Sequence, residues 1–282
     1  MSAEETQAAL RPVAGPSSIG GGWRRFFDLL YLISVTEFKK TYFGTVLGYV
    51  WSLLRPLLLF AVLLFVFTQI FRVGSQVTNY PELLLFNIVV FSFFQEATTL
   101  SVASVVNQEG IVRKTQFPRL VIPMSIVMTG LFNLAANMVA VFIFLLAFGV
   151  SAMATWLLFP LLLFLLIVLT ACVAMLLSSL YVRYRDVAII WGVAVTALFY
   201  ATPVLYPLEI VPERFRELIA LNPLTPIFVQ IRKWVIDPDA QGAAAAVGGW
   251  THLIAPTAIF VIVCGLGVWI FNREAPRVAE EL

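Results

Sequence analysis

The chain has 282 residues, of which 61% are hydrophobic and only 12% are charged, and its mean hydropathy is +0.94. Soluble globular proteins carry about 25% charged residues, so the composition excludes a soluble globule and indicates an integral membrane protein. The net charge of +2 is small and the charges are spread between apolar runs, which argues against a nucleic-acid partner.

The first 42 residues divide into two parts. Residues 1–22 end in SSIGGG and have little to bury, so we expect a flexible cytoplasmic tail. In residues 23–42 the longest uncharged run is 29–36, too short for the roughly 20 residues of a membrane span. Basic and polar residues gather on one side of a helical wheel and phenylalanines on the other. The segment predicts an amphipathic interface helix in the headgroup region; a simple basic anchor is the alternative.

Six later segments are apolar and long enough to cross a bilayer. They are residues 44–71, 81–106, 120–149, 156–181, 187–206 and 250–271. The predicted fold is an all-α integral membrane protein with one six-helix transmembrane domain over residues 43–272, followed by a cytoplasmic tail at 273–282.

The distribution of basic residues predicts the orientation of these spans. Most of the 18 basic residues fall in the N-terminal region, the loops after the second and fourth spans, and the C-terminal tail. The positive-inside rule makes this face cytoplasmic. We therefore expect both termini in the cytoplasm.

The segment before the last span, residues 207–240, has features of its own. Pro212 and Pro226 are placed to open two short helices, and Asn222-Pro223 breaks the chain between them. Each helix is about ten residues long and cannot span. We expect a pair of re-entrant helices at the outer face, which proteins tolerate only where protein or water satisfies the backbone; a surface loop is the alternative.

The chain carries few groups that could perform catalysis. Its single histidine, His252, lies at the outer end of the last span, and Cys172 and Cys264 lie within apolar runs, as expected of small buried side chains. No phosphate-binding loop, zinc motif or paired Cys/His spacing occurs. We therefore expect no catalytic, cofactor or metal site, and an energy source on another chain or in an ion gradient.

Two ionisable residues, Arg55 and Glu96, fall inside predicted spans. Burial of a charge in hydrocarbon is costly, so such residues are candidates for function. Both are predicted about 15 Å from the cytoplasmic end of their spans, at 1.5 Å per residue. We expect them to form an intramembrane polar pair or to share a polar cavity. A proton relay is a weaker alternative, because no other acid or histidine lies at that depth.

Aromatic residues are abundant at the ends of the first and fifth spans. The candidates for lining a conduit, where rings can stack on sugars, are Tyr42, Tyr49, Trp51, Phe199, Tyr200 and Tyr206. Interfacial belts account for most such residues in membrane proteins, and both interpretations stay open here.

A polar stretch, NQEGIVRKTQFPRLVIP at 107–123, separates the second and third spans. With LGYVWSLLRPLLL at 47–59, YRDV at 184–187, and YATPVLYP and VPERFRELIALNPLTPIF between 200 and 228, the chain resembles the membrane subunit of polysaccharide ABC exporters, which move O-antigen, teichoic acid, capsule or cell-wall galactan. The resemblance covers residues 23–271.

The resemblance implies a homodimer in the bacterial inner (plasma) membrane that works with two copies of an ATP-binding subunit. ATP and magnesium would then belong to the partner, and the substrate would be a polysaccharide linked to a polyprenyl-pyrophosphate lipid. It also implies that residues 107–119 are a coupling helix. The residues expected to dock the ATPase are Asn107, Glu109, Arg113, Lys114, Phe117 and Pro118, with Arg183, Arg185 and Asp186 as a second contact.

Two rival functions are considered alongside this one. A drug or lipid exporter would have a related architecture. A membrane-embedded glycosyl- or acyltransferase acting on the same lipids would need acidic or histidine clusters at one membrane face, and none is present in the sequence.

Overall fold

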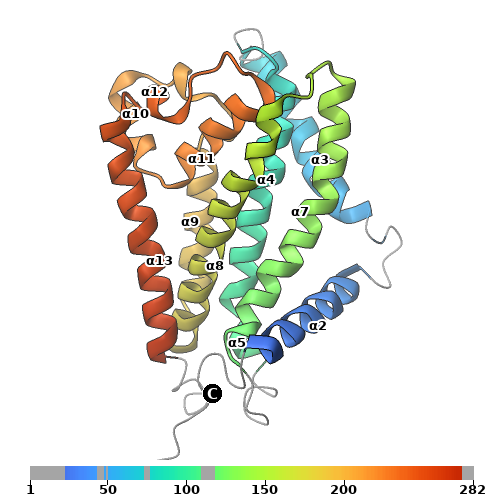
Figure 1. The fold of residues 1–282 in the computed structure, drawn as a ribbon, viewed down its shortest axis with the longest axis vertical. Helices are drawn as coiled ribbons and strands as arrows, with labels where there is room; N and C mark the ends of the chain where they lie inside the picture. The colour runs from blue at the N-terminus through green and yellow to red at the C-terminus, as the bar shows by residue number, and fades with distance from the viewer. Residues whose placement is uncertain (1–22, 43–47, 49, 73–76, 109–117, 275–282) are drawn as a thin grey trace, which may run out of the picture.

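The computed structural model describes residues 23–42, 48, 50–72, 77–108 and 118–274, which form helices and no strand (Figure 1). In the first half these are α2 (Trp23–Tyr42), α3 (Val50–Phe65) with a π-helical turn η1 (Val66–Ile70), α4 (Tyr80–Val102), α5 (Ser104–Asn107) and α7 (Val121–Ala147). The second half holds η3 (Ala154–Leu158), α8 (Phe159–Arg183), α9 (Val187–Ala201), η4 (Leu208–Ile210), α10 (Glu213–Ala220), α11 (Leu224–Ile231), η5 (Arg232–Ile236), α12 (Ala243–Ala246), η6 (Trp250–Leu253) and α13 (Ile254–Glu274).

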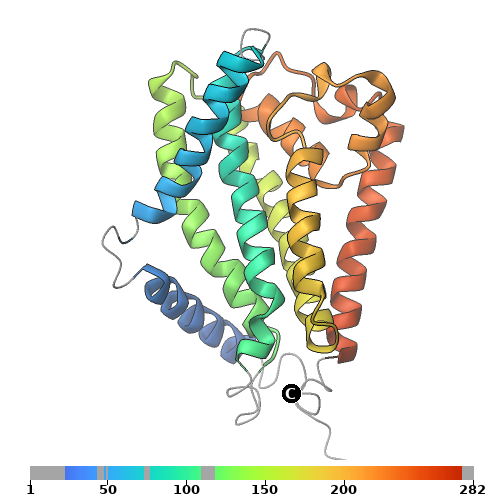
Figure 2. The same cartoon turned by 180° about the vertical axis from the view of Figure 1, so that it is seen from behind.

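Within the described residues, five helical segments are long and apolar enough to cross a membrane. They are Val50–Ile70, Tyr80–Val102, Val121–Ala147, Ala154–Arg183 and Trp250–Glu274. The prediction of an all-helical, multi-pass membrane fold is confirmed. Figures 1 and 2 show the described ends of the chain, the start of α2 and the end of α13, at the same end of the bundle.

The predicted fifth span, 187–206, is longer than the helix that forms there. Helix α9 ends at Ala201, and Thr202 is extended with φ −91° and ψ 144°. The residue before a proline is driven out of the α region, so Pro203 ends the helix. At about 1.5 Å per residue α9 is about 22 Å long, shorter than the ~30 Å hydrocarbon core. A sixth crossing at α9 stays a prediction.

The first span also starts later than predicted. Gly48 has a left-handed backbone with φ +51°, and α3 begins at Val50 rather than at residue 44. Glycine adopts this conformation without the steric cost that other residues bear. Arg55 is therefore five residues, about 8 Å, along its helix rather than about 15 Å.

Helix α4 is the centre of the bundle. It packs against α7, α8, α3 and α9, and most of its side chains are buried, including Tyr80, Leu84 and Phe86. Phe91 contacts Phe199 of α9, with ring centroids 5.2 Å apart. In lipid the apolar burial itself gains little, so close van der Waals packing is what stabilises such a helix.

Helices α8 and α13 come into close backbone contact at Gly267. A Cβ atom added there would lie 2.3 Å from the backbone oxygen of Cys172. Small residues permit this close approach in membrane bundles. Cys172 is buried at the contact, and neither it nor Cys264 forms a disulfide.

Helix α2 covers residues 23–42, the range expected for the interface helix, and lies obliquely against α7 at the side of the bundle, near the end where α13 finishes (Figure 2). Phe26 packs with Val105, Val121 and Ile122, and Thr129 of α7 donates a hydrogen bond to the Ser34 carbonyl at 3.2 Å. The opposite side exposes large apolar rings, Trp23, Phe27 and Tyr31. That face suits contact with lipid, and the place of α2 at a membrane surface stays a prediction.

The segment before the last span contains two short helices, α10 and α11. Pro212 precedes α10, as expected, but α11 begins at Leu224 instead of at Pro226. The Asn222 side chain accepts a hydrogen bond from the Leu224 amide at 3.0 Å, and Pro226 fits in the first turn because amides there have no intrahelical partner. Helix α11 is buried in the bundle and α10 is largely exposed. The re-entrant path through lipid stays a prediction.

Candidate functional site: a polar cavity between α3, α4 and α7

Polar side chains form a stripe along one face of α4. Ser92, Gln95, Glu96 and Thr99 follow the spacing i, i+3, i+4 and i+7, which places them on one side of a helix. All four line one cavity. A polar stripe in an otherwise apolar span faces protein or water rather than lipid.

The two neighbouring helices contribute matching polar positions. Asn133 and Asn137 lie one turn apart on α7 and are each 7% exposed, and Ser52 and Arg55 lie three residues apart on α3. The buried Asn137 Oδ1 has no hydrogen-bond partner in the described protein. These polar groups face the same cavity as the α4 stripe.

The cavity has a volume of about 640 Å³. Its lining is Trp51, Ser52, Arg55, Pro56, Leu59, Val89, Ser92, Phe93, Gln95, Glu96, Thr99, Leu100, Gly130, Asn133, Leu134 and Asn137. Figure 2 shows α3 inclined to α4, so that their ends nearest α2 stand apart. A space of this size, lined by hydroxyl, amide and charged groups, can hold water and a polar ligand within the bundle.

The structure brings Arg55 and Glu96 to the same cavity from different helices. The positive charge of Arg55 lies near enough to interact with the Glu96 carboxyl group. Their charged atoms do not form an ion pair within 4.0 Å among the described residues. The arrangement leaves both groups able to contact a ligand between them.

Glycine shapes the wall between α4 and α7. A Cβ atom added at Gly130 would lie 3.3 Å from the Phe93 ring and 3.4 Å from the Ala97 Cβ. The absence of a side chain at Gly130 therefore lets the two polar stripes approach each other. The polar α7 residues and Gly130 were missed in the sequence, although the i, i+4 spacing of the two asparagines is a signal that could have identified them.

The predicted aromatic residues do not gather at this cavity. Trp51 lines it, whereas Phe199 is packed on Phe91 in the core. Tyr200 is 60% exposed, and the Tyr206 hydroxyl donates to its carbonyl at 2.8 Å. Tyr49 and the side chain of Tyr42 lie outside the described residues.

Several of the residues predicted to dock an ATPase also lie outside the described part of the chain. They are Glu109, Arg113, Lys114 and Phe117. Asn107 is exposed at the end of α5, and Pro118 is buried just before α7.

The second predicted contact lies at the α8–α9 corner, where Arg183, Arg185 and Asp186 are exposed. Arg185 is held over the Tyr181 ring at 5.0 Å. Helices α5 and α8 are in contact, so Asn107 and the α8–α9 corner lie at the same end of the bundle (Figure 1).

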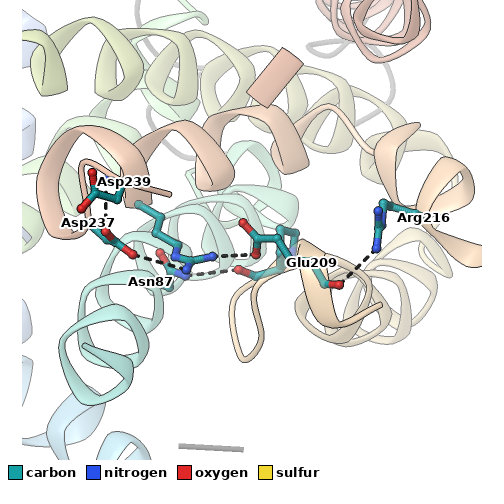
Figure 3. Close-up of polar contacts among 7 residues, drawn as sticks. Asn87, Glu209, Arg216, Asp237 and Asp239 are labelled. Carbon is teal, nitrogen blue, oxygen red and sulfur yellow. Dashed lines mark hydrogen bonds and ion pairs between the residues drawn. The ribbon is translucent and has the colours of Figure 1, made fainter. Parts of the chain in front are cut away.

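A second group of charges lies at the opposite end, in the segment after α9 (Figure 3). The Arg232 guanidinium contacts Glu209 at 2.6 Å and Asp237 at 3.6 Å. Arg216 donates to the backbone carbonyls of Glu209 and Val211 at 3.1 and 3.0 Å. In the sequence these residues were only outer-face charges, whereas the structure shows that they tie η4 to η5 and α10.

Asn87 links α4 to the same segment. Its amide donates to the carbonyls of Pro203 and Val204 at 3.2 and 3.3 Å. These carbonyls lie just past the end of α9, where Pro203 leaves the backbone without helical partners. The segment after α9 is therefore fixed to the central helix.

Comparison with known proteins gives a family match over most of the chain. The sequence profile of the family described as "ABC-2 type transporter" matches residues 28–235. An O-antigen export system permease protein RfbA from Klebsiella pneumoniae is 30% identical over 257 residues, covering 91% of this chain and 95% of that protein.

A protein of the same name from Myxococcus xanthus is 26% identical over 265 residues, covering 92% and 96% of the two chains. A second Klebsiella pneumoniae protein with this name is 29% identical over 257 residues. The similarity extends over nearly the full length of each relative.

Proposed function

Because the chain belongs to the ABC-2 type transporter family, we propose that it is the membrane subunit of an exporter that moves a lipid-linked polysaccharide out of the cytoplasm. The family makes it the permease of an ABC transporter and not an enzyme, and it implies a separate ATP-binding subunit. The names of its relatives, O-antigen export permeases, support a polysaccharide as the cargo.

The polar cavity carries this proposal. Its hydroxyl and amide groups match the hydrogen-bonding groups of sugars, and the Trp51 ring offers a face for stacking on a sugar. Arg55 provides a cation for a phosphate group. A drug exporter of related architecture is the rival in the same class, and the names of the relatives, O-antigen export permeases, favour the polysaccharide over it.

A membrane-embedded transferase is the rival of another class. It would need acids, histidines or metal ligands that converge at one face. The described residues contain no group of three or more His, Cys, Asp or Glu side chains placed to hold a metal ion. Glu96 is the one carboxylate among the cavity-lining side chains.

The complete exporter would be a homodimer with two ATP-binding subunits in the bacterial plasma membrane. The described chain ends lie at the same end of the bundle (Figure 1), and most of the basic residues fall in the sequence near them and in the loops after α5 and α8, which supports cytoplasmic termini. In this arrangement Asn107–Pro118, with the α8–α9 corner, would contact the ATPase. Copurification of the tagged permease with its ATP-binding subunit tests the partner.

Depletion of the permease in its own host tests the cargo. Lipid-linked glycan should accumulate on the cytoplasmic side of the membrane, because synthesis continues while export stops. The glycan is assayed by extraction and by its protection from externally added glycosidase. Normal surface glycan with no internal accumulation would overturn the proposed function.

A further inference from the structure

An apolar groove lies next to the polar cavity, between the same three helices. It is lined by Leu53 and Leu57 of α3, Leu85 and Val89 of α4, and Val141 and Phe144 of α7, among other apolar residues, and its volume is about 320 Å³. Each side chain that lines it is apolar. Apolar spaces of this kind stay free of ordered water and accept apolar ligands.

The groove and the cavity adjoin each other. Pro56 and Val89 line both of them. Along α7 the cavity is lined by residues between Gly130 and Asn137 and the groove by residues between Ala140 and Ala147. The groove is therefore about ten residues, or ~15 Å, farther along the helix.

The position of α2 indicates which of the two spaces, the polar cavity or the apolar groove, lies nearer the headgroups. Thr129 and Phe132 of α7 contact Ser34 and Phe38 of α2, directly beside the cavity residues that begin at Gly130. If α2 lies among the headgroups, the polar cavity begins near headgroup depth and the groove lies deeper in the hydrocarbon. A lipid of the cytoplasmic leaflet has the same order of polar and apolar parts.

We propose that the groove binds the hydrocarbon chain of the substrate's lipid anchor while its polar head occupies the cavity at Arg55 and Glu96. This inference rests on the proposed function and adds a binding site for the lipid itself. Val89 and Pro56, at the junction, would lie where the chain meets the head. The lipid anchor is favoured over bulk phospholipid because the large cavity that adjoins the groove at Pro56 and Val89 carries polar and charged groups that can bind a glycosylated head.

Photocrosslinking in the intact exporter tests the occupant. A benzophenone amino acid replaces Phe144 in the groove, and the matched control replaces Phe164, an α8 ring that is 59% exposed and lies outside the groove. Cells of the host strain are irradiated and the captured lipid is identified by mass spectrometry. The Phe144 probe should capture the polyprenyl carrier several times more than the Phe164 probe does. Capture of phospholipids alone, in the same proportions at both sites, would overturn the inference.

A groove-filling variant provides the second measurement. Ala140→Phe places a ring in the groove, and Ala135→Phe places one on the exposed part of α7 outside both spaces. Ala140→Phe should lower export at least ~tenfold, equivalent to about 1.4 kcal/mol, because the ring occupies the space of the hydrocarbon chain. Equal export in the two variants would contradict the inference, and crosslinking alone decides the question if Ala140→Phe does not insert.

Different results would contradict the lipid site in the groove and the proposed function of the protein. If the wild-type exporter moves lipid-linked glycan but the Phe144 probe captures only bulk phospholipid, the groove site is wrong and the proposed function stands. If no lipid-linked glycan accumulates on depletion, the proposed function itself is wrong.

Discussion

At the scale of single residues, Arg55 and Glu96 define the character of the cavity. A lone charge within an apolar bundle is costly, and an opposite charge in the same cavity reduces that cost. Asn133, Asn137 and Gln95 add neutral polar groups around them. The cavity therefore combines a balanced pair of charges with hydrogen-bonding groups for a ligand.

Neutralising both charges should destabilise the protein by less than the sum of the losses from neutralising each charge alone. Arg55→Met or Glu96→Gln leaves one uncompensated charge, whereas the double variant leaves none, so we expect a coupling of ~1–2 kcal/mol in the stability of the solubilised protein. Thermal melting of the wild type, the two single variants and the double variant in detergent measures this coupling. Strictly additive losses of stability would contradict an interaction between the two charges. If Arg55 also contacts the substrate, export by the double variant stays at least ~tenfold below wild type, about 1.4 kcal/mol in barrier height.

At the scale of helices, glycine and proline decide positions that the apolar pattern alone could not predict. Hydropathy located the spans well, because a run of about 20 apolar residues is typical of a transmembrane helix. It placed the start of the first span too early, before Gly48, and the end of the fifth span too late, beyond Pro203. At both positions the backbone conformation sets the limit of the helix. A closer reading of Pro203 would have found the second stop, whereas the left-handed Gly48 depends on the tertiary structure.

The α8–α13 contact gives a prediction at this scale. Gly267→Ala would push a methyl group into the backbone at Cys172, and overpacking of this kind costs ~1–3 kcal/mol. We expect a lower melting temperature for the solubilised exporter. Gly265→Ala, two residues away with nothing within 4 Å of its added Cβ, is the control and should be neutral or stabilising by up to ~1 kcal/mol. Equal losses in both variants would show that the close approach does not matter.

The candidate site was only partly predictable for a related reason. The sequence identified Arg55 and Glu96, because charges within spans are conspicuous. It could not show that Asn133 and Asn137 face the same cavity, since the rotation of α7 about its axis depends on packing with α4 at Gly130. Aromatic residues predicted to line a conduit were sorted only by the tertiary structure, which packs Phe199 against Phe91 and leaves Trp51 on the cavity.

At the scale of the whole molecule, we propose that the predicted coupling region would join the cavity to the ATP-binding subunit. Helix α4 carries the polar stripe, and α5 follows it after the single turn residue Ala103 and ends at Asn107, so a displacement at that end of the bundle can be passed to α4. The basic and acidic residues that follow Asn107 offer polar contacts to a soluble ATPase.

A double substitution tests this link. We expect Glu109→Ala with Arg113→Ala to leave membrane insertion intact but to uncouple ATP hydrolysis from export, because the docking contacts are lost and the spans are untouched. Membrane fractionation, ATPase activity of the assembled exporter and surface glycan are measured together. Arg183→Ala with Arg185→Ala is the comparison and should have a smaller effect. Unchanged coupling and export in the first variant would exclude a docking role.

Reconstitution provides the decisive measurement. The permease and its ATP-binding partner are placed in lipid vesicles with a short lipid-linked glycan, and movement of the glycan between leaflets is followed by its accessibility to an added glycosidase. We predict ATP-dependent movement of the glycan that falls at least ~tenfold, or about 1.4 kcal/mol, in Arg55→Met. Movement of an unglycosylated amphiphile at full rate, with the lipid-linked glycan left in place, would contradict a polysaccharide exporter.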